Sequence, residues 1–226
     1  AFLAKGLGKK AMIRLSQPIP ETYSFLEKYM PKDSIPMEKV DVIAVVDCPN
    51  LNRIGDLKNQ VLSSGKKIIN IDHHISGIKF GTVNWINPEA SSTGEMMYEL
   101  FRCLKVPLNR KAMEAIYSAI LTDTGFFHYE NTSARCLYVA SLLRPYVSHV
   151  KLTERLSRNN PLSKMKLLGG VLSGIKVSAD GKIGWIEITQ PLCRKSGSKM
   201  DETEGFIDYA RSLKGVRVAV CFKEED

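Results

Sequence analysis

Three groups of polar residues could together bind a divalent metal ion, because each one stands where an apolar segment of the sequence ends. The groups are Asp47, Asp72-His73-His74 and Asp123. Carboxylates and imidazoles are metal ligands, and several anions crowded into one cleft are unfavourable unless a cation compensates their charge. The chain has only four histidines, and two of them fall within this set. The three groups together therefore indicate a metal centre.

Each group taken alone also has an ordinary structural explanation. A carboxylate after a strand is commonly a helix cap or a turn residue, which is the alternative for Asp47. Adjacent histidines such as His73 and His74 are often surface or packing residues. Asp123, within Thr122-Asp123-Thr124-Gly125, could make an Asx-turn. The metal-centre hypothesis therefore requires that all three groups converge in the fold.

Two apolar runs predict the strands that would position the first two groups. Residues 42–46 and 67–71 are mostly β-branched and apolar, which is typical of parallel strands covered on both faces. Asp47 and Asp72 follow these runs and are 25 residues apart, enough for one crossover connection. Ligands of open α/β sheets bind just beyond the carboxyl ends of the strands. We therefore expect both aspartates at one edge of a sheet.

Helical patterns surround these strands. Ser92 and Glu95 form a capping box that opens a helix ending near Cys103, and residues 109–121 predict a second helix that leads to Asp123. Residues 2–10 and 21–29 also have helical patterns, and residues 11–15 predict a short strand. Strands alternating with helices indicate an α/β fold with a doubly wound, mostly parallel sheet.

The pattern changes after about Pro145 and predicts a second, smaller α+β domain. Basic helical segments at 151–160 and 162–172 precede two strands around Asp180-Gly181, then a helix at 201–213 and a strand at 216–222. We therefore expect a metal-binding catalytic domain at 1–146, a basic helical linker at 147–174, and a partial substrate-binding domain at 175–226.

Composition favours a soluble globular protein. The 226 residues are 44% hydrophobic and 25% charged, and no apolar run approaches the roughly 18 residues of a membrane span, so we expect no membrane association. Five scattered cysteines favour a reducing cytoplasm over a disulfide framework. Of the net charge of +8, residues 144–176 contribute seven cations against one acid. This stretch could attract phosphate ligands or could simply be a solvated helix face.

Four stretches resemble the motifs of the DHH phosphoesterase superfamily and occur in the same order. They are Val45-Val46-Asp47, Asn70-Ile71-Asp72-His73-His74, Ala90-Ser91-Ser92-Thr93-Gly94-Glu95 and Thr122-Asp123-Thr124-Gly125-Phe126-Phe127. Three further stretches are similar to the DHH/DHHA1 oligoribonucleases that also dephosphorylate 3′-phosphoadenosine 5′-phosphate: Asp47 to Arg53, Asn131-Thr132-Ser133 and Gly215 to Val220. The resemblance covers nearly the whole chain.

This resemblance implies a site with two manganese ions, or with Mg²⁺ or Co²⁺ in their place. Asp47 would bridge the two ions, and His73 and Asp123 would ligate one of them. Asp72 would orient His73, and His74 would face the substrate phosphate or the leaving group. Attack by a metal-bound hydroxide would then cleave the phosphoester without a covalent protein intermediate.

Four further residues have expected roles in substrate binding by the same resemblance. Arg53 would hold a phosphate oxygen, and Ser92 and Thr93 would line the cleft between the two domains. His128 stands where relatives often carry a cation such as Arg, and it could contact phosphate or be a packed or solvent-facing histidine.

Two motifs of the superfamily do not occur in this sequence. These are an upstream motif with a His and an Asp-x-Asp pair, and a downstream glycine-rich loop with a histidine. We therefore expect the sequence to be an internal portion of a longer protein, truncated at both ends.

Three functions remain open from the sequence. The first is a manganese phosphodiesterase and phosphatase acting on short RNA and 3′-phosphoadenosine 5′-phosphate, with a possible homodimeric state. The second is hydrolysis of pyrophosphate, polyphosphate or a cyclic dinucleotide. The third is a phosphate-ligand binding module that retains the fold and is catalytically incomplete.

Overall fold

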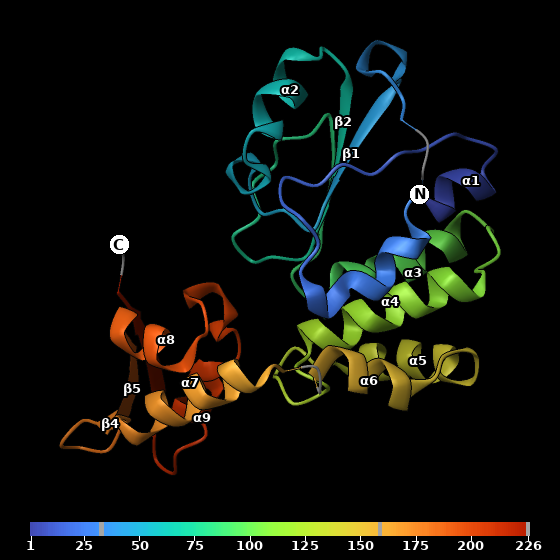
Figure 1. Cartoon of the computed structure of the whole chain (residues 1–226). Helices are drawn as coiled ribbons and strands as arrows, with labels where there is room; N and C mark the ends of the chain where they lie inside the picture. Colours follow the sequence, from blue (N-terminus) through green and yellow to red (C-terminus); the bar gives the residue numbers. More distant parts are fainter. Residues whose placement is uncertain (32–33, 158–159, 225–226) are drawn as a thin grey trace. The chain divides into compact units, whose positions relative to one another are not determined.

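A parallel three-stranded sheet forms the centre of the first of two units in the computed structural model (Figure 1). The structure describes residues 1–31, 34–157 and 160–224. Unit 1 comprises Ala1–Ser157 and unit 2 comprises Arg158–Asp226. Residues 147–174, expected to be a linker, contribute a helix to each unit. Within the described residues, no helix is long and apolar enough to cross a bilayer.

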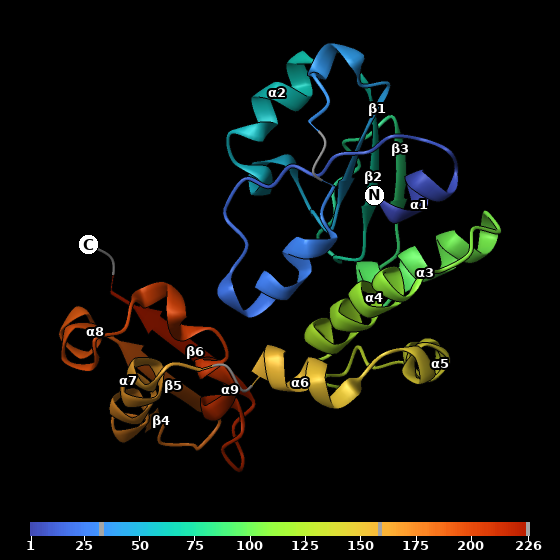
Figure 2. The ribbon, with the colours of Figure 1, turned by 45° about the vertical axis from the view of Figure 1, so that its right-hand side comes forward.

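The sheet of unit 1 confirms the two predicted strands and adds a third. Its strands are β1 (Val42–Val46), β2 (Lys67–Asp72) and β3 (Val83–Ile86), which lie side by side in chain order (Figure 2). Val46 pairs with Ile71, so the carboxyl ends of β1 and β2 lie at the same edge. The sequence did not indicate β3, whose four residues include only two β-branched ones.

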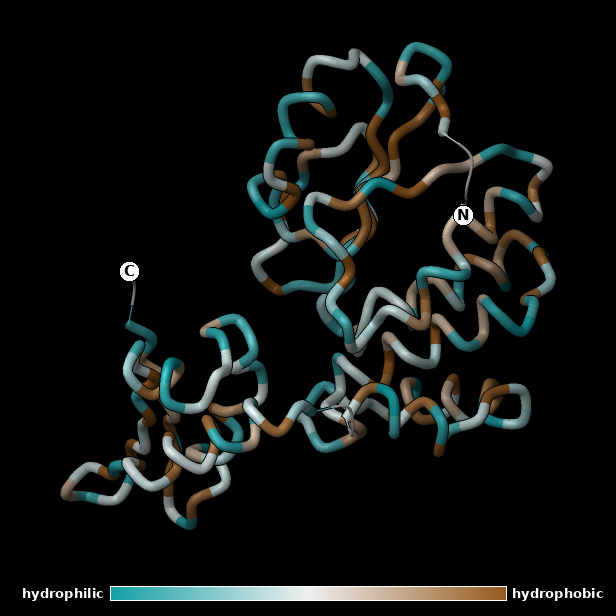
Figure 3. The backbone as a smooth tube through the Cα atoms, in the orientation of Figure 1, coloured by the Kyte–Doolittle hydropathy of each residue, from teal (hydrophilic) through white to brown (hydrophobic). Residues whose placement is uncertain are grey.

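Helices pack on both faces of this sheet, which confirms the doubly wound α/β fold. Helix α2 (Leu57–Ser63) contributes Val61 to a cluster with Val45 and Ile68 of the strands. Helix α3 (Thr93–Cys103) contributes Met96 to a cluster on the other face with Ile71. The hydropathy colouring shows the strands as apolar segments between more polar connections (Figure 3).

Strand β1 is less covered than the sequence predicted. Val42 is 44% exposed and Val46 is 49% exposed within unit 1, whereas Val45 is buried. In the described part of the chain, β1 pairs only with β2 and therefore lies at an edge. The continuous apolar run indicated the strand correctly, but the expectation that both of its faces are covered is wrong for these residues.

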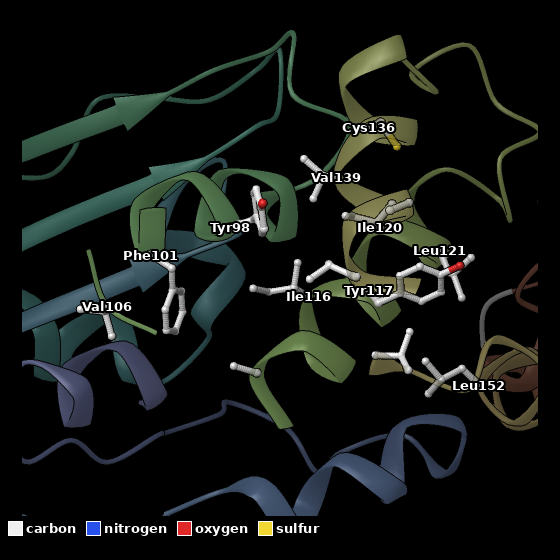
Figure 4. Packing of buried hydrophobic residues seen from close by; sticks show 14 residues of the cluster. Tyr98, Phe101, Val106, Ile116, Tyr117, Ile120, Leu121, Cys136, Val139 and Leu152 are labelled. Carbon is white, nitrogen blue, oxygen red and sulfur yellow. The ribbon is translucent and has the colours of Figure 1, made fainter. Parts of the chain in front are cut away.

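A layer of helices beside the sheet contains the largest core cluster. It comprises α3, α4 (Arg110–Asp123), α5 (Ala134–Leu143) and α6 (His149–Ser157), which surround side chains such as Ile120, Val139 and Leu152 (Figure 4). Arg158 and Asn159, at the end of the helix predicted for 151–160, lie outside the described residues. Gly94 allows α3 to approach α4 closely, because a Cβ at this position would lie 2.7 Å from Ala119 Cβ.

The amino-terminal region differs from its predicted pattern. Helix α1 covers only Phe2–Gly6, and the strand predicted for 11–15 is wrong because these residues join no sheet. Residues Glu21–Tyr29 form a 3₁₀ helix, η1. Shorter 3₁₀ turns follow elsewhere in unit 1: η2 (Met37–Lys39), η3 (Leu51–Ile54) and η4 (Arg144–Tyr146).

Unit 2 is a small α+β unit with its own core. Its sheet contains β4 (Lys176–Val177), β5 (Ile183–Ile188) and β6 (Val218–Lys223), with the predicted antiparallel pair around Asp180-Gly181. Its helices are α7 (Leu162–Ser173), α8 (Gln190–Ser196), η5 (Met200–Thr203) and α9 (Phe206–Arg211). The helix predicted for 201–213 is interrupted by Gly205, whose φ of 83° is incompatible with a continuous helix.

Candidate metal centre

Asp47 is fixed at the carboxyl end of β1 by an unusual backbone conformation. Its φ is 57°, in the left-handed region that aspartate tolerates better than most side chains. Its N–H donates to the carbonyl oxygen of Ile71 at 2.9 Å, which ties it to the end of β2. The side chain is 51% exposed. The carboxylate therefore stands at the sheet edge where His73 and His74 follow β2.

His73 lies between two carboxylates. Its Nε2 is 3.5 Å from Asp47 Oδ1 and 3.6 Å from Asp123 Oδ2, and its side chain is only 16% exposed. Its Nδ1 is 3.3 Å from the carbonyl oxygen of Ala90, which can only accept, so we assign the proton to Nδ1. The Nε2 lone pair is then directed at the carboxylates. The structure thus places His73 beside both Asp47 and Asp123, the other two ligands implied by the resemblance, although the group whose ligand atoms all lie within 4.8 Å of one another contains His74 and not Asp123.

The spacing of His73 Nε2 from each carboxylate is that of two ligands of one cation rather than that of hydrogen-bonded partners. Both contacts of Nε2 exceed the usual hydrogen-bond length. Ligand atoms that each lie about 2.1 Å from one divalent ion are separated by roughly 3 to 3.6 Å. The donor set, two carboxylates and neutral imidazole nitrogen, suits manganese and similar borderline ions. The residues present therefore fit a divalent metal.

Asp123 is a partly buried carboxyl group with a raised pKa. It ends α4, and burial raises the pKa of its carboxyl to about 6, with a further increase from the charge of Asp47 and an opposing effect of His73 and His74. Two carboxylates are thus crowded beside one imidazole. A bound cation would favour their ionised forms.

We expect Asp123→Asn to stabilise the metal-free protein at pH 8. The folded chain holds the Asp123 proton more tightly than the unfolded chain, so the stability of the parent falls as the pH rises from about 4 to about 6. Asparagine removes this penalty, which is at most about 3 kcal/mol because one pKa unit corresponds to about 1.4 kcal/mol. Urea unfolding in the presence of a chelator measures the difference.

The pH dependence provides the check on this prediction. The advantage of Asp123→Asn should shrink as the pH is lowered from 8 toward 4, because the parent carboxyl then becomes neutral in both states. An Asp123→Asn variant that is destabilised equally at all pH values would show that the carboxylate is not under electrostatic strain.

Asp72 orients His74, which corrects the expectation that it orients His73. Its Oδ1 lies 2.7 Å from His74 Nδ1, and its side chain is fully buried. His73 and His74 follow the end of β2 at Asp72, and the contact of Asp72 is with the second of them. The second oxygen, Asp72 Oδ2, has no hydrogen-bond partner among the described residues.

His74 lies at the exposed side of the same cluster. One ligand atom each of Asp47, His73 and His74 lie within 4.8 Å of one another, and the two imidazole rings are 4.8 Å apart. Because Asp72 engages Nδ1, Nε2 of His74 is the nitrogen available to other groups. The His74 side chain is 38% exposed, more than twice the value for His73. In this position, His74 can contact either a bound ion or a substrate group that binds the ion.

Residues 90–93 contact two of the candidate metal ligands from the side of α3. The Ala90 carbonyl contacts His73, and Thr93 Oγ1 donates to Asp47 Oδ1 at 2.8 Å. Thr93, expected to line the substrate cleft, therefore contacts a ligand carboxylate. Ser92 is fully buried, and its Oγ caps α3 by accepting from the Glu95 N–H at 3.1 Å. This burial does not fit the expected contact of Ser92 with substrate.

The predicted capping box is present in a modified form. The Glu95 carboxylate accepts from both the N–H and the Oγ of Ser91, at 2.9 and 2.6 Å, instead of reaching the Ser92 N–H. Glu95 is 3% exposed. Glu95 therefore fixes Ser91, the residue before the cap. Ser91 directly follows Ala90, whose carbonyl contacts His73.

Arg53 and His128, the other two expected substrate-binding residues, are both exposed. Arg53 lies in η3, close enough to Cys48 that its charge partly offsets the increase in the pKa of that thiol caused by burial. His128 Nδ1 lies 2.9 Å from the Gly125 carbonyl, which leaves Nε2 free of this contact. The structure does not bring either residue into the group of Asp47, His73 and His74.

Sequence reasoning did not assign a role to Asn131 or to the backbone of Ala90. Asn131 Nδ2 donates to the carbonyl oxygens of Ser91 and Asp123, each at 2.9 Å. The sequence of Asn131-Thr132-Ser133 resembles a known motif. That resemblance did not indicate which groups the Asn131 side chain contacts. A backbone carbonyl such as that of Ala90 leaves no signal in residue identity.

Comparison with known proteins finds a matching family model and several similar relatives. Residues 2–120 match the DHH family, N-terminal domain. Over 222 residues the chain is 32% identical to the bifunctional oligoribonuclease and PAP phosphatase NrnA of Bacillus subtilis, covering 96% of this chain and 69% of that protein. It is 29% identical over 229 residues to the protein of the same name from Thermus thermophilus, covering 98% and 65%.

A solved structure supports the fold. The chain superimposes on an exopolyphosphatase-related protein from Bacteroides fragilis with a TM-score of 0.85 and 23% identity, covering 99% of this chain and 69% of that one. The chain thus spans about two thirds of the length of these proteins. At this identity the likeness concerns the arrangement of the elements and not the activity.

Proposed function

The chain belongs to the DHH family of phosphoesterases, and on this premise we propose that it hydrolyses short oligoribonucleotides and 3′-phosphoadenosine 5′-phosphate with the help of manganese. The relatives from Bacillus subtilis and Thermus thermophilus are named for these two activities. The observation that supports the proposal is that Nε2 of His73 lies within 3.6 Å of carboxylate oxygens of both Asp47 and Asp123, while His74 lies in one group with Asp47 and His73. Because the chain spans about two thirds of the length of these relatives, the activity is proposed for the protein as a whole.

The metal would be held by Asp47, by Nε2 of His73 and by Asp123. When bound, such an ion lowers the pKa of a coordinated water and neutralises charge on the phosphoryl oxygens. Asp47 keeps its orientation because Thr93 donates to one of its oxygens. His73 presents Nε2 because the Ala90 carbonyl holds its Nδ1 proton. These two contacts would orient the ligands toward the ion.

His74 and Arg53 would act on the substrate. The buried carboxylate of Asp72 accepts from Nδ1 of His74 and fixes the ring with Nε2 toward the exposed side of the cluster. From there Nε2 can contact a phosphate oxygen or the leaving oxygen. The exposed guanidinium of Arg53, in the turn that follows Asp47, can make a bidentate contact with a phosphate. His128 is a further candidate for a phosphate contact.

A substrate panel tests this function. The full-length protein with Mn²⁺ is incubated with RNAs of two to five nucleotides, 3′-phosphoadenosine 5′-phosphate, pyrophosphate, polyphosphate and a cyclic dinucleotide. We expect mononucleotides from the short RNAs and AMP from 3′-phosphoadenosine 5′-phosphate, and loss of both products with a chelator. Hydrolysis of pyrophosphate or polyphosphate alone would contradict the proposed substrates, and no turnover of any compound would support a binding module.

A further inference from the structure

The side chain of Asn131 joins two segments that are far apart in the sequence. Its Nδ2 donates to the Ser91 carbonyl, 40 residues away, and to the Asp123 carbonyl, 8 residues away. Both distances are 2.9 Å. A primary amide nitrogen carries two planar N–H groups directed away from each other, so it can bridge two carbonyl oxygens. Both donors of Asn131 are used in this way.

The first of these segments positions two of the candidate ligands. Ser91 lies between Ala90, whose carbonyl contacts His73, and Thr93, whose hydroxyl contacts Asp47. Glu95 holds the N–H and Oγ of Ser91 from the α3 side, and Asn131 holds its carbonyl from the opposite side. The backbone at Ser91 is therefore fixed at both its donor and its acceptor.

The second segment ends with the third candidate ligand. Asp123 is the last residue of α4, where backbone carbonyls lose their intrahelical partners. Asn131 supplies a donor to the Asp123 carbonyl and thereby fixes the residue whose carboxylate faces His73. The N–H groups of Thr124, Gly125 and Phe126 satisfy earlier carbonyls of this helix end, and Asn131 adds a donor for the last one.

A strained turn brings Asn131 back to the end of α4. Gly125, Phe126 and Phe127 have φ values of 53°, 58° and 70°, an uncommon run of three left-handed residues. A Cβ on Gly125 would lie 2.5 Å from the ring of Tyr129, so this turn leaves no space for a side chain there. Phe126 and Phe127 pack against the helical core, which compensates the strain. Strain of this kind is characteristic of functional sites.

We propose that Asn131 is a positioning residue of the metal centre, which locks the Asp123 ligand to the segment that holds Asp47 and His73. It acts through the carbonyls of Ser91 and Asp123 and does not itself bind the ion. This inference rests on the metal centre of the proposed function. It adds that the three ligands form one preorganised unit because a single amide connects their supports.

Manganese titration of the full-length protein tests this role. We expect Asn131→Ala and Asn131→Asp to weaken Mn²⁺ binding by about 10- to 100-fold, the usual cost of removing a group that orients metal ligands. The rise in melting temperature on adding Mn²⁺ should shrink accordingly. Asn131→Asp keeps the shape of the side chain but loses both donors and adds a negative charge, whereas Asn131→Ala loses the donors without adding charge, so an effect common to both variants reports the lost hydrogen bonds.

Asn84→Ala is the matched control. Asn84 also makes two side-chain hydrogen bonds to backbone in unit 1, with the N–H and carbonyl of Gly81 at 2.9 and 2.7 Å, but it does not contact the ligands. The Asn84→Ala variant should lower the melting temperature of the metal-free protein. It should leave the Mn²⁺ affinity within about twofold of the parent, because a contact remote from the ligands does not affect the binding equilibrium.

The outcomes separate this inference from the proposed function. Unchanged Mn²⁺ affinity in both Asn131 variants, together with tight binding by the parent, would overturn the positioning role and leave the function intact. A parent that binds no Mn²⁺ would overturn both. Weaker binding in the Asn131 variants than in Asn84→Ala, whether or not RNA is hydrolysed, would support the positioning role.

Discussion

Replacement of Asp47 by alanine should abolish tight Mn²⁺ binding and reduce phosphoesterase activity by about 1,000-fold or more, since a metal ion contributes several kcal/mol to the transition state and each 1.4 kcal/mol is tenfold in rate. Asp47 is the carboxylate grouped with both histidines within 4.8 Å, and Thr93 orients it. No other carboxylate in the described residues occupies this end of β1. Isothermal titration with Mn²⁺ and single-turnover hydrolysis of a dinucleotide measure the two effects.

Asp41→Ala is the control for this variant. Asp41 is exposed and directly precedes β1, at the opposite end of the strand from Asp47. Both variants remove one carboxylate from the same strand, so a general effect of charge or of strand stability would appear in both. Asp41→Ala should retain the Mn²⁺ affinity and the rate of the parent, and normal turnover by Asp47→Ala would show that the site lies elsewhere.

The two adjacent histidines should differ sharply when each is replaced by glutamine. His73→Gln should weaken Mn²⁺ binding by about 100-fold or more, because it removes an imidazole ligand and costs more than the 10- to 100-fold typical of orienting groups. His74→Gln should leave the Mn²⁺ affinity within about tenfold and lower kcat instead, since only a supporting contact is lost. The distinction follows from their places: His73 lies between Asp47 and Asp123, whereas His74 pairs with Asp72.

Parallel Mn²⁺ titrations and kcat measurements on the two variants check this difference. Equal loss of Mn²⁺ affinity in both would contradict it and would make His74 a ligand of equal weight. Because ligand atoms of Asp47, His73 and His74 lie within 4.8 Å of one another, His74 is close enough to be a ligand itself. The two variants therefore distinguish a site in which only His73 binds the ion from one in which both histidines do.

The strands and the three polar groups were predictable because their signals are local. The runs before Asp47 and Asp72 are continuously apolar, and an aspartate that ends such a run stands out from its neighbours. The parallel pairing of β1 and β2 then places both residues at one sheet edge. The convergence of Asp123 required a further helix and followed from the family resemblance rather than from the pattern.

The partners of individual side chains were not predictable in the same way. Asp72 contacts His74 because of the path that the chain takes beyond the end of β2, which the resemblance did not indicate. The Ala90 carbonyl orients His73, and a backbone group of this kind has no signature in the sequence. Thr93 and Ser92 were assigned to substrate, whereas long-range packing of α3 directs them to Asp47 and to a helix cap.

The most direct test of the metal centre is an anomalous diffraction experiment on crystals of the full-length protein grown with Mn²⁺. The account predicts a manganese peak within about 2.2 Å of Nε2 of His73 and of carboxylate oxygens of Asp47 and Asp123, the usual bond length for such ligands. A manganese ion bound elsewhere, with no peak between these three side chains, would contradict it.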